Sequence, residues 1–172
     1  DEEMPQTEKE SLRYTNSCPL QWETRPPLIS ASSWQMLPLN NISILLLEPQ
    51  SPANIGSVAR VMKNMGLTSL YLINPQTEIN AESFQLACGA DDILAAARRT
   101  ETLEETLRPF SLCVGTTSRS VDTFPRVLTP HQLATQISEF SGESQIALLF
   151  GPERTGLTNE QVQYCQWLVT IP

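Results

Sequence analysis

A carboxylate and a guanidinium, those of Glu153 and Arg154, stand shortly after an apolar run of the chain. The run, residues 146–150, predicts a buried strand, and the Gly151-Pro152 pair that follows cannot easily continue a strand or a helix. Open α/β sheets bind ligands at the carboxyl ends of their strands. The two charged side chains therefore indicate a polar ligand site, although they could also pair with each other or face solvent.

An amide and a second guanidinium follow another apolar run, residues 42–47, at the predicted start of a helix. We expect Asn54 to cap this helix through its side-chain oxygen. Gly56 and Ala59 leave room for another backbone to approach, and Arg60 lies in the second helical turn. This combination at a strand–helix junction suits recognition of phosphate or ribose. A capped helix with a surface arginine explains the same residues.

A third group of polar residues, Thr116, Thr117 and Ser118, follows the predicted strand 112–115. Their hydroxyls and backbone amides can offer hydrogen bonds to a polar ligand. An ordinary polar turn is the alternative interpretation of this loop.

The elements that must position these residues alternate between strand and helix. We expect strands at residues 42–47, 69–73, 112–115, 146–150 and 167–171. Helices are predicted at residues 54–65, 81–88, 102–107, 130–137 and 158–165, with a turn or short helix at 91–98. This alternation is typical of an α/β fold with a mostly parallel sheet and helices on both faces.

Composition excludes several classes of protein. The chain has 172 residues and a formal net charge of −8, which argues against a protein that coats nucleic acid through a general basic surface. A site-directed RNA enzyme with a local basic patch stays open. No P-loop, Gly-x-Gly-x-x-Gly or Gly-x-Ser-x-Gly motif is present, and no apolar stretch approaches the roughly 20 residues that span a bilayer.

The histidine and cysteine content indicates neither a metal site nor a disulfide framework. The single histidine, His131, is expected at the surface, and the four cysteines form no Cys-x-x-Cys pair. We expect Cys88, Cys113 and Cys165 to be buried, reduced thiols of a cytoplasmic protein.

Residues 1–39 differ from the rest of the chain because they contain five prolines, many polar residues and no sustained period. We interpret them as a flexible or non-native N-terminal leader. A peptide-binding arm anchored by Trp22 and Trp34 is the alternative. Residues 40–172 are then the folded domain.

The order and spacing of the three polar groups resemble those of the SpoU-type branch of the SPOUT RNA 2′-O-ribose methyltransferases. The matching segments are residues 54–60 (Asn-x-Gly-x-x-x-Arg), 63–67 (Lys-Asn-Met-Gly-Leu) and 148–160 (Leu-Leu-Phe-Gly-Pro-Glu-Arg-x-Gly-Leu-Thr-Asn-Glu). Residues 87–90 and 115–119 also resemble the bacterial tRNA (cytidine/uridine-2′-O)-methyltransferase subgroup. The resemblance covers about residues 40–172.

The resemblance implies an α/β SPOUT domain with a trefoil knot, one of the rare exceptions to unknotted topology. It implies a homodimer that transfers the methyl group of S-adenosylmethionine to a ribose 2′-hydroxyl of tRNA, in the anticodon loop. It implies no membrane and no metal. The family's third motif continues beyond a segment like Ile171-Pro172, so we expect the knot-forming C-terminal segment to be missing from this chain and the natural protein to be longer.

The resemblance also implies roles for individual residues. Arg60 is the catalytic candidate, as the group that binds phosphate and stabilises the nascent alkoxide, because arginine stays protonated in nearly all settings. Asn54 and Glu153 would orient Arg60 and the substrate. The cofactor would lie against the threonine and serine residues after strand 112–115, the glycine after strand 146–150, and an isoleucine near the end of the sequence. These are Thr116, Thr117, Ser118, Gly151 and Ile171.

Two other readings remain open. One is an RNA-binding or assembly domain that has kept the fold without catalysis. The other is an unrelated α/β enzyme that binds a free nucleotide and no tRNA.

Overall fold

The computed structural model describes residues 39–117, 126–138 and 144–170. Within these ranges the chain forms a seven-stranded sheet in the order β3-β2-β1-β6-β4-β7-β5, and all neighbouring strands are parallel. The strands are β1 Ile42–Leu47, β2 Ser69–Ile73, β3 Arg98–Thr100, β4 Leu112–Thr117, β5 Val127–Leu128, β6 Ile146–Phe150 and β7 Trp167–Thr170. The predicted α/β fold with a parallel sheet is confirmed.

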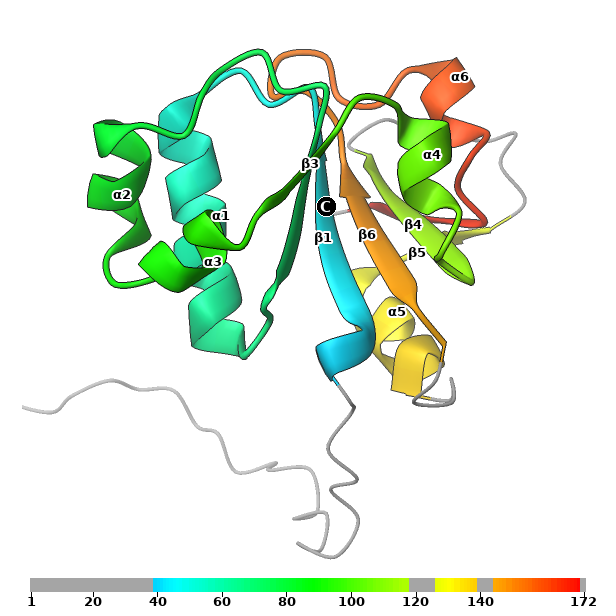
Figure 1. Ribbon diagram of the computed structural model, residues 1–172. Coiled ribbons are helices and arrows are strands. Elements are labelled where there is room, and N and C mark those ends of the chain that lie inside the picture. The colour runs from blue at the N-terminus through cyan, green and yellow to red at the C-terminus, as the bar shows by residue number, and fades with distance from the viewer. Residues whose placement is uncertain (1–38, 118–125, 139–143, 171–172) are drawn as a thin grey trace, which may run out of the picture. The chain divides into compact units, whose positions relative to one another are not determined.

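Helices cover both faces of this sheet (Figure 1). They are α1 Pro52–Met65, α2 Ala81–Ala87, α3 Asp91–Ala95, α4 Leu103–Leu107, α5 Pro130–Ser138 and α6 Asn159–Val162, with a 3₁₀ turn at Leu39–Asn41. Figure 1 shows α1, α2 and α3 on one side of the sheet and α4 and α6 on the other.

The alternation of side chains along β1 explains the two layers, because successive residues of a strand point to opposite faces. Ile44 and Leu46 belong to the apolar cluster beneath α1, α2 and α3. Leu45 and Leu47 belong to the cluster on the other face, which includes Leu103 of α4. Since both faces are buried, the strand reads as a continuous apolar run.

Glycine at position 56 allows α1 and α2 to pack closely. A Cβ at Gly56 would lie 2.1 Å from the backbone oxygen of Ser83, a distance that no side chain could occupy. The expectation that Gly56 admits another backbone is therefore confirmed, and its role is in helix packing.

Several predicted bounds differ from the observed ones. The short strands β3 and β5 were not predicted, because three and two residues carry no recognisable period. Helix α6 ends at Val162 although the prediction extends to residue 165. Thr158 and Gln161 form a capping box at the start of α6.

Cys88 is exposed, so its predicted burial is wrong. It is the C-cap of α2 and has a left-handed backbone, with a φ of 46°.

The order of the strands places the predicted polar groups at one edge. From β1 the chain continues to β2 and β3 on one side, while β6 and β4 lie on the other side of β1. Strand order therefore reverses next to β1, and ligand sites of open α/β sheets lie at such a reversal, outside the carboxyl ends of the strands. The loops that follow β1, β4 and β6 meet there. The trefoil knot and the N-terminal leader stay predictions.

Candidate functional site

Helix α1 begins at Pro52, and Ser51 rather than Asn54 is its N-cap. Ser51 has an extended backbone, and its hydroxyl accepts a hydrogen bond from the Asn54 backbone nitrogen at 3.4 Å. Proline in the first turn loses no helical hydrogen bond, because first-turn N–H groups have no partner within the helix. The prediction that Asn54 caps the helix is therefore wrong, and its side chain is available for another contact.

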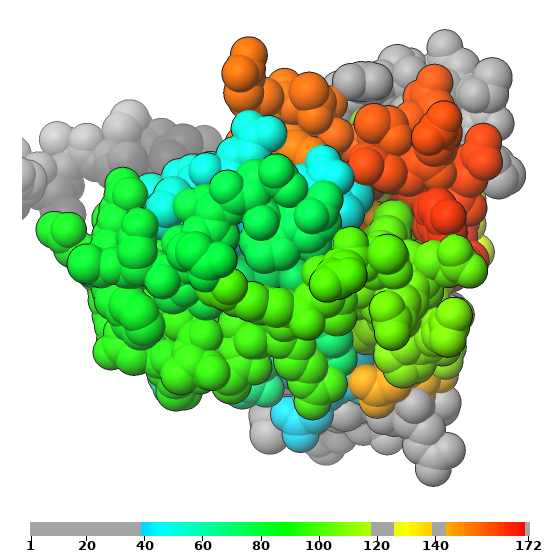
Figure 2. All heavy atoms as spheres, turned by 45° about the horizontal axis from the view of Figure 1, so that its top comes forward, coloured from blue at the N-terminus to red at the C-terminus, as the bar shows by residue number. Residues whose placement is uncertain are grey.

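The Asn54 side chain contacts Glu153, 99 residues further along the chain. Its amide donates to Glu153 Oε1 at 3.1 Å, and the backbone nitrogens of Gln50 and Ser51 donate to the same carboxylate at 3.0 and 3.3 Å. The carboxylate thus lies at the start of α1, where the helix dipole favours an anion. This contact joins the loop after β6 to the loop after β1, whose surfaces adjoin in Figure 2 (orange and cyan).

The electrostatic state of Glu153 follows from these donors. Partial burial raises the pKa of Glu153. The hydrogen bonds from Asn54 and from backbone nitrogens lower it by more, so the pKa lies below its ordinary value of 4.5. The carboxylate is therefore charged at neutral pH. Among the described residues, its neighbour Arg154 makes no ion pair with it or with any other carboxylate, so the simple pairing of Glu153 with Arg154 is not observed.

The loop after β6 forms a compact turn. The Gly156 nitrogen donates to the Pro152 carbonyl oxygen at 2.8 Å, and Gly156 has a φ of 64°, which favours glycine. A Cβ on Gly151 would lie 2.5 Å from both the Gly156 carbonyl carbon and the Leu157 nitrogen. A larger residue at position 151 would force the turn apart, so packing within the protein itself requires this glycine.

The loop after β1 is fixed by its neighbour β2. Glu48 and Asn74, which directly follow the two strands, have φ values of 49° and 45°, which are uncommon for residues other than glycine. The Glu48 nitrogen donates to the Ile73 carbonyl oxygen at 2.8 Å, and the Asn74 amide donates to the Glu48 carboxylate at 3.2 Å. These bonds hold the loop whose backbone nitrogens bind Glu153.

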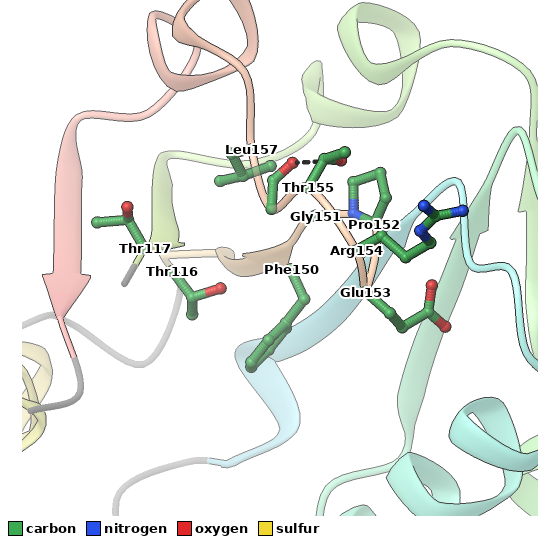
Figure 3. A pocket seen from close by; sticks show the side chains of 10 residues that line it. Thr116, Thr117, Phe150, Gly151, Pro152, Glu153, Arg154, Thr155 and Leu157 are labelled. Atoms are coloured by element: carbon green, nitrogen blue, oxygen red, sulfur yellow. Dashed lines mark hydrogen bonds between the residues drawn. The ribbon is translucent and has the colours of Figure 1, made fainter. Parts of the chain in front are cut away.

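A depression of about 480 Å³ lies on the other side of the loop after β6 (Figure 3). It is lined by Thr116, Thr117, Phe150, Gly151, Pro152, Glu153, Arg154, Thr155, Gly156 and Leu157. Thr116, Thr117 and Gly151, which are predicted to bind a cofactor, therefore lie together. Ser118 and Ile171, predicted to do the same, lie outside the described residues.

A second hollow, of about 270 Å³, lies next to the first one and shares Phe150, Gly151 and Glu153 with it. Its lining also includes Asn54 and Ser57 of α1. The two hollows therefore extend from the end of β4 to the first turns of α1. Glu153 lines both of them.

Arg60 makes no hydrogen bond or ion pair with Asn54 or Glu153. It is exposed, and it has no hydrogen bond or ion pair within the part of the chain that the structure describes. Six residues separate it from Asn54, which corresponds to about 9 Å along the helix and about a third of a turn around it. It follows Ser57, a lining residue of the second hollow, by one helical turn.

Most other cations in the described ranges have a partner. Lys63 pairs with Asp92 at 2.6 Å, Arg99 pairs with Glu78 at 2.5 Å, Arg98 donates to the Tyr71 hydroxyl, and Arg126 donates to Gln136. In those same ranges Arg60, Arg108 and Arg154 are exposed and make no polar contact. Arg108 follows α4 just before β4 begins, so it lies at the opposite edge of the sheet. The unpaired cations near the depression are Arg60 and Arg154.

The sequence reasoning missed Gln50 and Ser51 as partners of Glu153. A signal for Ser51 was present, because serine followed by proline is a common helix start. Gln50 acts through its backbone nitrogen, which no residue pattern reveals. Phe150 and Leu157, which line the depression, were not singled out because apolar residues there read as ordinary core.

Comparisons with known proteins agree with this geometry. The model of the SpoU rRNA Methylase family matches residues 41–172. The chain is 41% identical over 134 residues to a tRNA (cytidine/uridine-2′-O-)-methyltransferase TrmJ of Yersinia pestis (strain Pestoides F), covering 78% of this chain and 52% of that protein. The chain thus spans about half the length of the curated relatives that it matches.

Solved structures show the same likeness in three dimensions. A probable methylase family protein from Haemophilus influenzae Rd KW20 superimposes with a TM-score of 0.73 and 37% identity, covering 78% of this chain and 56% of that one. TrmJ from Z. mobilis ZM4 superimposes with a TM-score of 0.70 and 37% identity, covering 76% of this chain and 58% of that one. With its two motifs joined by the contact between Asn54 and Glu153, and with the match over residues 41–172, the chain belongs to the SpoU rRNA Methylase family.

Proposed function

We propose that this chain carries the methyltransferase domain of an RNA 2′-O-ribose methyltransferase that acts on a cytidine or uridine in the anticodon loop of tRNA. The contact between Asn54 and Glu153 carries the proposal, because it joins the family's first two motifs at the ligand edge of the sheet, beside a depression. Similarity to proteins named TrmJ supports tRNA as the substrate class. A cytoplasmic location goes with this proposal.

S-adenosylmethionine is the methyl donor that we propose. The depression of about 480 Å³ is within the range of small-molecule sites, which is about 300–1,000 Å³. Its lining combines apolar side chains with threonine side chains and loop backbone groups, which suits a nucleoside with a flat base and polar edges. The Thr116 and Thr155 hydroxyls donate to the Leu149 and Gly156 carbonyl oxygens, so their remaining capacity toward a ligand is to accept hydrogen bonds. Thr116, Thr117 and Gly151 would hold the cofactor, with Ser118 and Ile171 as further contacts. When bound, this cofactor supplies an activated methyl group.

The protein's own task is to prepare the ribose hydroxyl. A hydroxyl becomes a good nucleophile when its proton leaves or when its developing charge is stabilised. The unpaired guanidinium of Arg60 is free to bind a phosphate and stabilise that charge. Asn54 and Glu153 contribute by fixing the start of α1, the helix that carries Arg60. Because Arg60 makes no hydrogen bond or ion pair with either of them, their influence on it is exerted through the helix.

A homodimer is the proposed assembly. Val61 and Met65 lie one helical turn apart on α1, and their exposed fractions are 56% and 64%. Two large apolar side chains on the exposed face of the helix that carries Arg60 favour an interface there. A second copy on this face would lie close to the catalytic candidate.

The test is methyl transfer to a tRNA transcript, measured on the protein at the length of its TrmJ relatives, because the chain spans about half of their length. The modified nucleotide is mapped by mass spectrometry of the RNA, and cofactor binding is measured by calorimetry. Arg60→Ala should lower the rate by about 100-fold or more while cofactor affinity is kept. Arg108→Ala, which removes an equally exposed arginine from the opposite edge, should leave the rate unchanged.

The possible results separate the readings of the sequence. Binding of tRNA without methyl transfer by the wild-type protein supports the domain that has lost catalysis. Affinity for a free nucleotide without affinity for tRNA supports the unrelated nucleotide-binding enzyme. Absence of any heat of S-adenosylmethionine binding to the extended protein overturns the cofactor assignment.

A further inference from the structure

Two of the cysteines lie side by side in the core. Cys113 belongs to β4 and Cys165 lies two residues before the start of β7, and their exposed fractions are 3% and 5%. The Cys113 thiol donates to the Cys165 sulfur, with the two Sγ atoms 3.8 Å apart. The proposed methyl transfer uses neither thiol.

Backbone contacts fix both cysteines in this position. The Gln166 nitrogen donates to the Cys113 carbonyl oxygen at 2.9 Å, and the Gln166 side chain accepts from the Cys113 nitrogen at 2.7 Å. A Cβ on Gly115 would lie 2.7 Å from Cys165 Sγ. The absence of a side chain at Gly115 therefore makes the space in which the two thiols meet.

The thiol pair lies beneath the depression. Both cysteines belong to the apolar cluster that contains Leu157, and Leu157 also lines the depression. Gly115, where a Cβ would meet Cys165 Sγ, is followed directly by Thr116 of the lining. The chain between the two cysteines includes the ends of β4 and β6 and the compact turn after β6.

The surroundings also favour the chemistry of the pair. The hydrogen bond from the Cys113 thiol lowers the pKa of Cys165, because it stabilises the thiolate, whereas the same bond and burial raise the pKa of Cys113. A thiolate formed in such a pair can attack a disulfide or another electrophilic oxidant, and the neighbouring thiol can then resolve the product. Cys88, exposed at the end of α2, has no cysteine among its contacts in the described residues.

We propose that Cys113 and Cys165 are a redox-active dithiol that closes to an intramolecular disulfide beneath the proposed cofactor site. Two S–H bonds break and one S–S bond forms, two protons leave, and two electrons pass to an oxidant. The oxidant is a small disulfide, which is reduced to two thiols, or an azodicarboxamide, which is reduced to the hydrazine. The disulfide closes a ring that holds the strand ends and the turn around the depression.

The first experiment maps the bond in the double variant Cys18→Ser/Cys88→Ser, which keeps only this pair of thiols. The folded protein is treated with diamide, the diamide is removed, and the protein is denatured in the presence of an alkylating agent before digestion with trypsin. We expect the peptide 100–119 to be joined to the tryptic peptide that begins at Thr155, and the two to separate after reduction. Failure to find joined peptides in the folded protein, or joining only when urea is present, overturns the proposal.

The second experiment measures the consequence for stability. Closing a ring of this size restricts the unfolded chain, so oxidation should raise the Tm of the double variant by about 5–10 °C, and dithiothreitol should reverse the change. Adding Cys113→Ser to the double variant should abolish the response to diamide. An equal rise in Tm without Cys113 contradicts the assignment. Neither readout involves RNA or the cofactor, so the outcome is independent of the proposed function.

Discussion

The contact of Glu153 with the start of α1 can be tested by replacing Glu153 with glutamine, which keeps the size of the side chain and removes its charge. The carboxylate accepts from Gln50, Ser51 and Asn54, and it lies at a helix N-terminus. Hydrogen bonds to charged groups contribute about 1.5–3 kcal/mol each when sheltered, but an exposed site reduces them to a fraction of this, and a helix N-terminus adds about 0.3–1 kcal/mol. We therefore expect Glu153→Gln to lower the free energy of unfolding by about 1–2 kcal/mol at pH 7.

The assay is urea unfolding of both proteins at pH 7 and near pH 3, supported by thermal unfolding, in which the difference corresponds to about 3–6 °C in Tm. The pKa of Glu153 is lowered in the folded protein, so its stabilisation is present above the ordinary value of 4.5 and is lost as pH falls through the lowered value. The difference between the proteins should thus shrink in acid.

A matched control is Glu101→Gln, because Glu101 is exposed and accepts no hydrogen bond from a described side chain. It should change the unfolding free energy by less than about 0.5 kcal/mol. A cost of Glu153→Gln no greater than that of this control at pH 7, or a cost that is undiminished near pH 3, refutes the stabilising role of the Glu153 carboxylate.

Three further predictions concern other parts of the site. Gly56→Ala should destabilise the protein by about 3 kcal/mol in urea unfolding, because its Cβ would meet the Ser83 backbone, and stability close to wild type would contradict the close packing of α1 and α2. Ser51→Ala should lower the free energy of unfolding by about 1 kcal/mol through loss of the N-cap. Ser51→Asp should keep most of that stability, because aspartate can also cap the helix, and urea unfolding measures both variants. Arg154→Ala should weaken tRNA binding and reduce the slope of log K against log salt by about 0.7–0.9, measured by fluorescence anisotropy, whereas Arg108→Ala should leave the slope unchanged.

The long elements could be predicted because each one carries its own pattern. The apolar runs of β1, β2 and β6 are present in the sequence, as are the Gly66 C-cap of α1 and the capping box of α6. The short strands β3 and β5 have no such pattern and form because longer neighbours, β2 and β7, offer them hydrogen bonds. Their existence is a property of the sheet.

The candidate site shows the same division. Residue types and spacing indicated Asn54, Arg60, Glu153 and the threonine loop, and the structure brings Asn54 and Glu153 into contact and places Thr116 and Thr117 in the depression. The helix start at Ser51 decided what Asn54 does, because a serine cap three residues before the predicted start leaves the asparagine amide available to Glu153. Arg60 keeps its predicted role as a proposal.

The sequence by itself determined where strands and helices run and which loops carry polar residues, because hydrophobic period and turn chemistry act between residues close in the chain. Tertiary structure decided which distant groups meet, as with Asn54 and Glu153 or Cys113 and Cys165. These meetings depend on the order of the parallel strands and on backbones that approach closely at Gly56, Gly115 and Gly151. Such contacts arise from packing in three dimensions, where a missing side chain at one position creates the space that residues far along the chain occupy.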